Sequence, residues 1–399
     1  MKQLTILVFT IILAIQAPGS AQDLFSITVD AQGLTSFTEE FDNASDLINA
    51  FDGNFIEDRI PGFNDNAIAT GTLGFRGVDV ILAFETAGTA LRLRIPETGL
   101  DVTFTGATRD ASENLLEDFF ESEGEAEITK LLQALARKTT SDPIAGNPNS
   151  LISTAVYNDF NSAFVPEDPQ PPRKEKSKKE ARNDISVGAV YSILNRSGAD
   201  NEKITIPLGY TYRSKTNPRR KYKFKLPISR MEISNSIAYH VSPSIAVSLP
   251  VNKFWTMTPS LGYGLSGSDD FGTGTQLVTG SLTNAFKFEL WGLRHTYGNM
   301  VGYYDSLKLS IGDFSIDPDI TIIPFVNGFQ TQIPTENFIK GSSIRLYIID
   351  TNYFGDDVAV EHSDEFGLAL TVWRGATIGV NYLYSSEIKG VRFGFNFRF

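Results

Sequence analysis

The chain has 399 residues, a formal net charge of −12 and no cysteine. The lack of cysteine excludes a disulfide framework, a thiolate metal site and a cysteine nucleophile. Three histidines, His240, His295 and His362, are too few and too far apart in the sequence to predict a metal cluster. We therefore expect neither a cofactor nor a bound metal.

The negative charge is concentrated in the first half of the chain. Residues 22–172 carry 26 acidic and 8 basic side chains, which gives 8 − 26 = −18. Residues 173–182 are basic, and residues 183–399 are close to neutral. Such asymmetry predicts separate domains, and the acidic half argues against nucleic acid as a partner.

The first 21 residues have the pattern of an export signal. Lys2 precedes an apolar run from Leu4 to Ile15, and the small residues Gly19, Ser20 and Ala21 follow. The run is too short to span a bilayer comfortably, and small residues are typical of a cleavage site. We interpret residues 1–21 as a signal peptide. The rest of the chain has no apolar run of transmembrane-helix length.

Residues 22–164 predict a small acidic α+β domain. The segments 70–85 and 91–106 alternate or run apolar between glycine-containing turns, which indicates strands. The period then becomes helical near 110–138, where two apolar stripes are separated at Gly124.

A further helix is expected near 149–164. Leu151, Ala155, Phe160 and Phe164 lie near one stripe of it, among small and polar neighbours. Two placements remain open for this helix. It packs against the other helices of the N-terminal domain, or it enters the lumen of the barrel described below, where small polar groups could surround it.

Residues 165–183 form a linker rich in proline and lysine. Pro166, Pro169, Pro171 and Pro172 favour an extended backbone, and the following charges keep the segment in water. Attraction of the basic run to anionic lipid is a weaker alternative.

Residues 184–399 predict an antiparallel transmembrane β-barrel of about 12 strands. Segments of roughly 10 residues alternate between apolar and small or polar side chains, and the connections between them alternate between tight and long. Lipid offers the backbone no hydrogen bonds, so such a sheet must close on itself. The aromatic residues Trp255, Trp291, Trp373 and Tyr222 at strand ends suit interfacial girdles. A soluble sandwich would need these apolar faces to meet in a single core.

The chain ends in GVRFGFNFRF, in which Phe393, Phe395, Phe397 and Phe399 share one face of a strand. This end resembles the terminal strand of Gram-negative outer-membrane proteins. The resemblance implies that the four phenylalanines are an assembly signal read by the barrel assembly machinery of the outer membrane.

A narrower resemblance concerns the translocator barrels of autotransporters. GATIGVNYLYSSE followed by GVRFGFNFRF resembles their closing hairpin, and NKFWTMTPSLGYGLS resembles their central hairpin. SDPIAGNPNSLISTAVYNDF resembles the segment that leads into solitary outer-membrane autotransporter-like barrels. The sequence departs from the family pattern because only about 140 residues precede the linker and no internal repeat indicates a large passenger.

Catalytic chemistry is weakly supported. Ser363, His362 and Asp364 are a triad by residue type only, because neighbours along a strand point to opposite faces. A calcium site at Asp356 and Asp357 has no diagnostic ligand spacing. Paired carboxylates such as Glu39 and Glu40 are interpreted as solvated loop charges.

We therefore expect a non-enzymatic outer-membrane barrel of autotransporter type without a large passenger. Its role would be structural, translocator-like or surface-interacting, its partners outer-membrane lipid and the assembly machinery, and its external ligand unidentified. The N-terminal domain would be periplasmic. One alternative is a pore or transporter for small solutes, and another is an outer-membrane hydrolase or self-cleaving protein.

Overall fold

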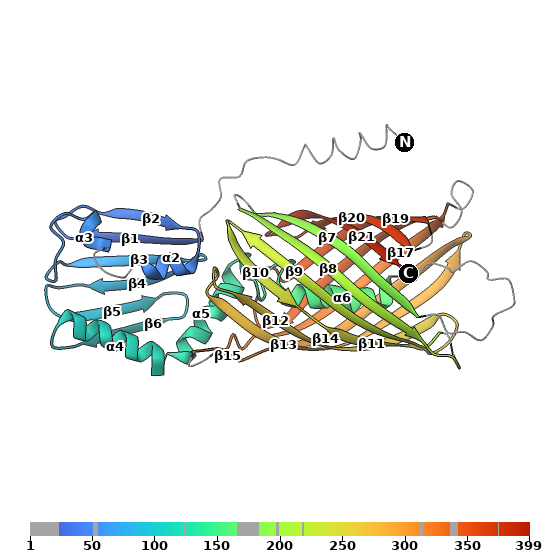
Figure 1. Cartoon of the computed structure of the whole chain (residues 1–399), viewed down its shortest axis with the longest axis horizontal. Coiled ribbons are helices and arrows are strands. Elements are labelled where there is room, and N and C mark those ends of the chain that lie inside the picture. The colour runs from blue at the N-terminus through green and yellow to red at the C-terminus, as the bar shows by residue number, and fades with distance from the viewer. Residues whose placement is uncertain are drawn as a thin grey trace, which may run out of the picture.

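The structure is a computed structural model of the whole chain. It describes residues 24–50, 55–122, 124–165, 183–196, 199–217, 219–311, 314–335, 342–373 and 375–399. The predicted signal peptide and all of the predicted linker except residues 165 and 183 lie outside these residues. The described chain forms an N-terminal sheet domain and a closed barrel, arranged end to end (Figure 1).

The N-terminal domain is built on one six-stranded antiparallel sheet with the strand order β2-β1-β3-β4-β5-β6. Its strands are β1 (Phe25–Ala31), β2 (Phe37–Phe41), β3 (Ala69–Phe75), β4 (Val78–Phe84), β5 (Ala90–Ile95) and β6 (Leu100–Thr105). The two predicted strand segments each contain a hairpin, β3–β4 and β5–β6. The expectation of an α+β domain is confirmed.

Helices cover one face of this sheet. The short helices α2 (Ala44–Asn49) and α3 (Phe55–Arg59) lie near β1 and β2, and α4 (Arg109–Ser122) and α5 (Glu125–Lys138) lie near β4 to β6. The apolar stripes predicted near 110–138 supply Leu116, Phe119, Leu132 and Leu135 to the core beneath α4 and α5. Among the described residues, no helix is both long and apolar enough to cross a membrane.

The remaining strands form the barrel, and its closure is shown by the pairing of the last strand with the first. The strands are β7 (Asp184–Arg196), β8 (Ala199–Arg213), β9 (Lys221–Ile233), β10 (Ser236–Val241), β11 (Ser244–Pro250), β12 (Trp255–Ser268), β13 (Thr273–Leu290), β14 (Leu293–Leu307), β17 (Thr321–Pro334), β18 (Ser343–Gly355), β19 (His362–Trp373), β20 (Ala376–Tyr384) and β21 (Lys389–Arg398). A small separate hairpin pairs β15 (Leu309–Ile311) with β16 (Phe314–Ile316).

The barrel has twelve strands because β10 and β11 are two parts of one strand. Both pair with β9 on one side and β12 on the other, and Ser242 and Pro243 separate them. Proline donates no ladder hydrogen bond, which accounts for an interruption at this point. The prediction of an antiparallel barrel of about 12 strands is confirmed.

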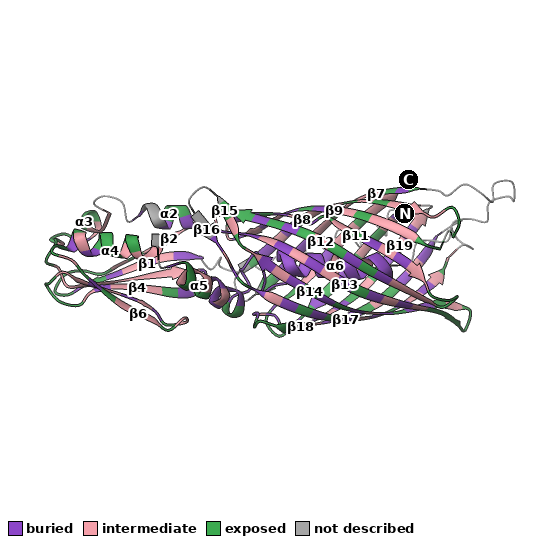
Figure 2. Ribbon diagram, turned by 90° about the horizontal axis from the view of Figure 1, so that it is seen from below, coloured by how far each residue is buried: buried purple, intermediate pink, exposed green. Residues whose placement is uncertain are grey.

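The outer surface of the barrel is apolar. In β8, Ile204, Ile206 and Leu208 are exposed and alternate with less exposed neighbours, and Leu261 of β12 is 72% exposed. Figure 2 shows the same alternation of exposed and buried residues along the strands. A soluble protein does not leave such a continuous apolar surface in water. Closure and an apolar exterior are together the requirements for a barrel in a membrane, so this is an outer-membrane-type β-barrel.

The two ends of the barrel differ. We call the end where β7 begins and β21 finishes the terminal mouth, and the opposite end the domain mouth. The aromatic residues Tyr222, Trp255 and Trp291 lie on strand ends or turns at the terminal mouth. The expected alternation of tight and long connections is not kept, because seven residues separate β8 from β9 and eight separate β17 from β18 at the terminal mouth.

The N-terminal domain is docked on the domain mouth (Figure 1). Phe271, Met231, Ile233 and Ala238 of the barrel belong to the same apolar cluster as β1 and α2. Hydrogen bonds join Ser236 Oγ to the Asp42 carbonyl at 2.8 Å, the Ala44 amide to the Asp270 carbonyl at 2.8 Å and Thr129 Oγ1 to the Asp317 carbonyl at 2.7 Å.

A buried ion pair holds the segment that enters the barrel. Arg76, in the β3–β4 turn, lies 3.3 Å from Asp142 between guanidinium and carboxylate atoms, and both side chains are fully buried. Asp142 Oδ1 also accepts the amides of Ile144 and Ala145, both at 2.8 Å. Burial lowers the pKa of Arg76 and raises the pKa of Asp142, while their attraction opposes both shifts. The pair therefore fixes the loop that follows α5 against the sheet.

Candidate functional site: the helix inside the barrel

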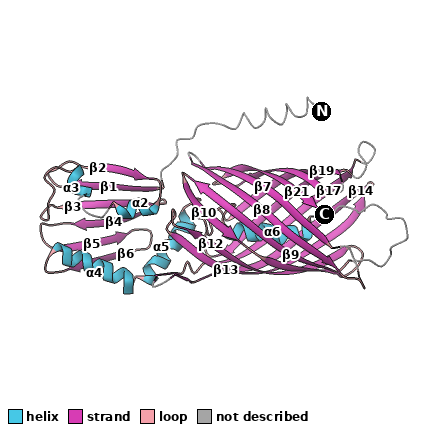
Figure 3. Ribbon diagram, viewed as in Figure 1, coloured by secondary structure: helices cyan, strands magenta, loops and turns pink. Residues whose placement is uncertain are grey.

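The helix α6 (Leu151–Phe164) lies inside the barrel, as Figure 3 shows. It begins at Ser150, whose side chain accepts the Ser153 amide, and this capping contact satisfies one of the free amides of the first turn. The helix contacts β11, β12, β13, β14 and β17. The sequence left two placements open for this helix, and the structure shows it in the lumen of the barrel. The described residues of α6 make no comparable contact with α4 or α5.

All four residues singled out on the stripe are buried: Leu151, Ala155, Phe160 and Phe164. The rings of Phe160 and Phe164 stack on each other with centroids 4.7 Å apart. They lie against Gly298 and Gly328, which face each other across β14 and β17. A Cβ atom at Gly328 would lie 2.8 Å from Phe160 and 2.9 Å from Phe164. The wall thus has a recess, made by the two glycines, that receives the aromatic pair.

A single acidic side chain of α6 is fastened to the wall. The carboxylate of Asp159 accepts hydrogen bonds from Ser260 Oγ at 2.8 Å, Ser281 Oγ at 3.2 Å and Tyr304 Oη at 2.7 Å. These donors come from β12, β13 and β14. Hydrogen bonds to a charged group contribute roughly 1.5–3 kcal/mol each, and a buried carboxylate without them would be strongly unfavourable.

Lysines of the wall bind backbone carbonyl groups of the helix, and the Asn158 carbonyl also accepts Ser162 Oγ at 2.8 Å. Lys225 Nζ donates to the Asn158 carbonyl at 2.7 Å and Lys223 Nζ to the Ser162 carbonyl at 2.6 Å. Gln330 Nε2 donates to the Phe164 carbonyl at 2.6 Å. The last carbonyls of a helix lack internal partners and carry partial negative charge, so cations at this end are stabilising. Near the other end, Lys203 Nζ donates to the Asn149 carbonyl at 2.6 Å.

A second polar group connects the helix with the last strands. Arg392 Nη1 pairs with Glu365 at 2.8 Å, and its guanidinium lies 4.4 Å from the centre of the Tyr157 ring. Asn381 Nδ2 donates to Glu365 at 2.8 Å. The helix is thereby held from opposite sides of the barrel. This arrangement can anchor a polypeptide through the wall of the barrel and obstruct the lumen.

Apart from the stripe on α6, the sequence did not identify the residues that hold the helix. The alternation of β9 predicts which of its side chains face inward, so Lys223 and Lys225 could be marked as polar residues at inward positions, whereas Asp159 lies on α6 and has no such signal. Their partners come from segments far apart in the sequence, and no local signal pairs Asp159 with Tyr304 across 145 residues.

The terminal phenylalanines all point outward. Phe395 and Phe399 are exposed, and the Phe399 amide donates to the Ile185 carbonyl at 2.9 Å, so the final residue joins the seam with β7. The structure therefore places the predicted assembly signal on the apolar face of the strand that closes the barrel.

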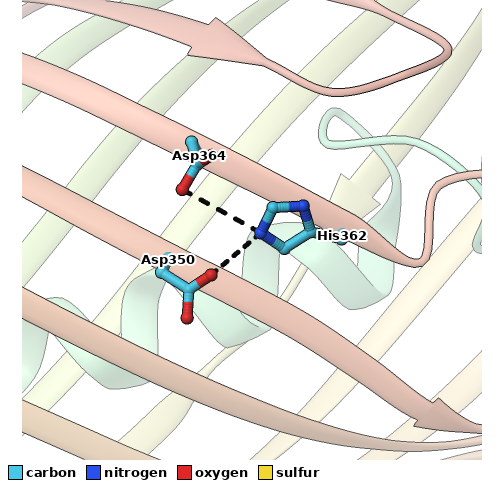
Figure 4. A group of neighbouring side chains, drawn as sticks. All are labelled: Asp350, His362 and Asp364. Carbon is cyan, nitrogen blue, oxygen red and sulfur yellow. Dashed lines mark hydrogen bonds and ion pairs between the residues drawn. The ribbon is translucent and has the colours of Figure 1, made fainter.

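The residues Ser363, His362 and Asp364 do not form a triad, because neighbouring residues of a strand point to opposite faces. Ser363 is buried toward the lumen, while His362 and Asp364 lie on the outer face of β19. There His362 Nε2 is 2.9 Å from Asp350 Oδ1 and 3.9 Å from Asp364 (Figure 4). The sequence did not indicate this group, because Asp350 lies on β18 and reaches His362 only through the pairing of β18 with β19.

His362, Asp350 and Asp364 could offer three ligand atoms to a cation. All three side chains are nevertheless exposed or partly exposed, and the contact between His362 and Asp350 accounts for their approach without one. Of the calcium candidates, Asp356 instead joins its loop to β17, because its carboxylate accepts the Thr321 amide at 2.7 Å.

No protein-family model matches the chain, and no curated protein matches it. Solved structures with a similar fold include the β domain of the Bordetella autotransporter BrkA, with 12% identity and a TM-score of 0.42, covering 54% of this chain and 98% of that one. The translocator domain of the autotransporter NalP from Neisseria meningitidis gives 12% identity and a TM-score of 0.42, covering 62% and 98%.

An outer-membrane channel from Pseudomonas putida F1 gives 9% identity and a TM-score of 0.41, covering 58% of this chain and 100% of that one. The similar structures thus include both autotransporter-type barrels and a channel. The twelve-stranded barrel of this protein is established by its own strand pairing.

Proposed function

We propose that this protein holds its N-terminal domain on the outer face of the outer membrane, using the barrel as an anchor of autotransporter type. The course of the chain through the barrel is the observation that supports this proposal. The N-terminal domain lies at the domain mouth, α6 runs through the lumen, and β7 begins at the terminal mouth. The chain therefore crosses the membrane once as a helix within the barrel before the barrel itself begins.

Orientation follows from the direction of assembly. An exported chain reaches the outer membrane from the periplasm, and the terminal strand is implied to be read there. The terminal mouth then faces the periplasm and the domain mouth faces outward. A periplasmic N-terminal domain would require the opposite orientation of the barrel, with the turn after Trp373 outside the cell. A periplasmic N-terminal domain and a terminal strand read from the periplasm therefore exclude each other in this fold, and we propose the external domain.

In this proposal the protein has no catalytic step. Its partners are outer-membrane lipid, the barrel assembly machinery and an external ligand met by the N-terminal domain. The docked domain and the anchored helix favour display over solute transport, because both occupy the path along the lumen.

Single-cysteine labelling tests the orientation, and the absence of native cysteine makes each introduced thiol unique. Thr103→Cys places a thiol on the exposed face of β6, and Lys215→Cys places one on an exposed turn of the terminal mouth. With an impermeant thiol reagent on intact cells, we expect labelling at position 103 and protection at position 215. Both should label after the outer membrane is permeabilised. Labelling at 215 alone in intact cells would reverse the orientation and refute external display.

A further inference from the structure

The terminal mouth contains a cavity of about 320 Å³ that is lined mainly by cations. We call it the basic vestibule. Its described lining residues are Ala163 and Val165 of the chain that leaves α6, and Arg213, Arg219, Lys221, Lys223, Ser248, Lys253, Thr256, Thr258 and Lys287 of the barrel. Six of these residues are basic, and the described lining includes neither aspartate nor glutamate.

Some of these cations contact other groups of the protein. Arg213 pairs with Asp184 at 2.6 Å, and Lys223 binds the Ser162 carbonyl. Arg219 Nη2 donates to the Asn252 carbonyl. Lys253, in the turn before β12, and Lys287, near the end of β13, are both exposed to water. Like charges held close together in a concave site repel one another and raise the local concentration of anions.

A second cavity of about 270 Å³ continues from the vestibule along one side of α6 and shares Lys223 and Val165 with it. Arg345, Arg392 and Arg398 also line it. The side-chain amides of Asn158 and Asn161 face this cavity, and their Nδ2 atoms are buried with no hydrogen-bond partner among the described residues. Buried donors without acceptors are unfavourable, and an anion with several oxygens would satisfy them.

We propose that the basic vestibule and the adjoining cavity bind a compact multivalent oxyanion of the phosphate type, which enters from the terminal mouth. Lysine and arginine supply charge-assisted donors, and arginine also matches the geometry of phosphate oxygens. The cations line a cavity at the end of the barrel, some of them beside residues of the chain that leaves α6, so the proposed ligand is a soluble anion and not a phospholipid headgroup. The proposed site does not depend on the orientation of the barrel in the membrane. It can therefore be tested independently of the proposed display function.

Isothermal titration of the full-length protein in a neutral detergent tests the site, with pyrophosphate as the probe and sodium chloride at equal ionic strength as the baseline. We expect saturable binding of one pyrophosphate per chain. The double substitution Lys253→Gln with Lys287→Gln should weaken binding about tenfold, because two charges near the anion are lost. These two lysines are exposed, and heat-modifiable migration on a gel checks that the variant barrel is folded.

Lys389→Gln is the matched control, because it removes an exposed lysine at the domain mouth. Equal loss of affinity in this control would indicate general electrostatic attraction and overturn the site. Heat that does not saturate, or none above the chloride baseline, would also overturn it. Binding to vesicles containing phosphatidylglycerol without binding of pyrophosphate would assign the cations to lipid and refute the proposed ligand.

Discussion

Two glycines illustrate how single residues determine the position of the lumen helix. Gly298 and Gly328 lie opposite each other on β14 and β17, and the stacked rings of Phe160 and Phe164 fill the space that side chains would occupy there. In sequence, each is simply a small residue in a strand. The two glycines position the helix only because α6, from another part of the chain, places the rings of Phe160 and Phe164 against them.

Gly328→Val should displace the aromatic pair and destabilise the folded barrel. A Cβ at this position lies within 3.0 Å of both rings, and overpacking of this kind typically costs about 1–3 kcal/mol. The temperature at which the folded form is lost on a gel should fall. Gly280→Ala is the control, since its Cβ would meet only Leu261 at 3.6 Å on the outer face. An equal effect from both substitutions would argue against the recess.

Asp142→Asn should weaken the junction between the N-terminal domain and the barrel. The amide keeps an oxygen for the Ile144 and Ala145 amides but removes the charge that faces Arg76. A buried charge left without its partner costs about 3–5 kcal/mol. Limited proteolysis should then release the N-terminal domain faster. Adding Arg76→Met should restore resistance, because it removes the isolated charge, and failure of this rescue would contradict the explanation.

At the scale of elements, α6 and β21 have different physical requirements. The helix combines an apolar stripe with polar neighbours, because its surroundings include a glycine recess, three hydroxyl donors to Asp159 and several lysines. The final strand instead keeps a strict alternation, with phenylalanine toward the lipid and Arg392 and Arg398 toward the lumen.

Phe399→Asp should prevent assembly of the barrel without preventing export. Phe399 ends the apolar face of β21, and its backbone joins the seam with β7, so a charge here disturbs both the implied signal and the closure. The heat-modifiable form should be absent from membranes while unassembled chain is present in the periplasm. Phe399→Tyr keeps an aromatic ring and should assemble normally. Wild-type amounts of heat-modifiable Phe399→Asp protein would eliminate the terminal-signal hypothesis.

At the scale of the whole molecule, the N-terminal domain, the loop after α5 and α6 together obstruct one continuous path. Residues 139–164 are nearly all buried between the sheet domain and the barrel wall. The protein is therefore expected to conduct ions poorly.

Removing residues 22–164 should open the barrel. Without α6 the lumen loses the helix that the wall lysines and Asp159 hold in place, and water and ions should fill the space. Planar-bilayer recordings should show small, infrequent currents for the full chain and stable open channels for the shortened one. Heat-modifiable migration confirms that the shortened barrel is folded. Unchanged conductance would mean that α6 does not block the lumen in the membrane.

Much of the architecture could be predicted from the sequence by itself. The period of two in residues 184–399 is imposed by lipid on one side and a filled lumen on the other, so it specified the antiparallel barrel and its approximate strand number. The change to a helical period near 110–138 and 149–164 indicated the helices for the same reason, because each buries one stripe. These features depend on neighbours along the chain and on the average polarity of each face.

Only the tertiary structure decided where the helix near 149–164 and the N-terminal domain lie. The stripe of Leu151, Ala155, Phe160 and Phe164 fits a domain core and a barrel lumen equally well, because both offer apolar contact. The choice depends on Gly298 with Gly328, on the donors to Asp159, and on Lys223 with Lys225. These residues come from five strands: β9, β12, β13, β14 and β17. The segment Lys221–Pro227 also shows what the sequence by itself cannot determine. The alternation of this segment predicts which side chains share a face, but only closure of the barrel directed Lys223 and Lys225 at carbonyl groups of α6. Closure also placed Lys221 and Lys223 with Lys253 and Lys287 around one cavity.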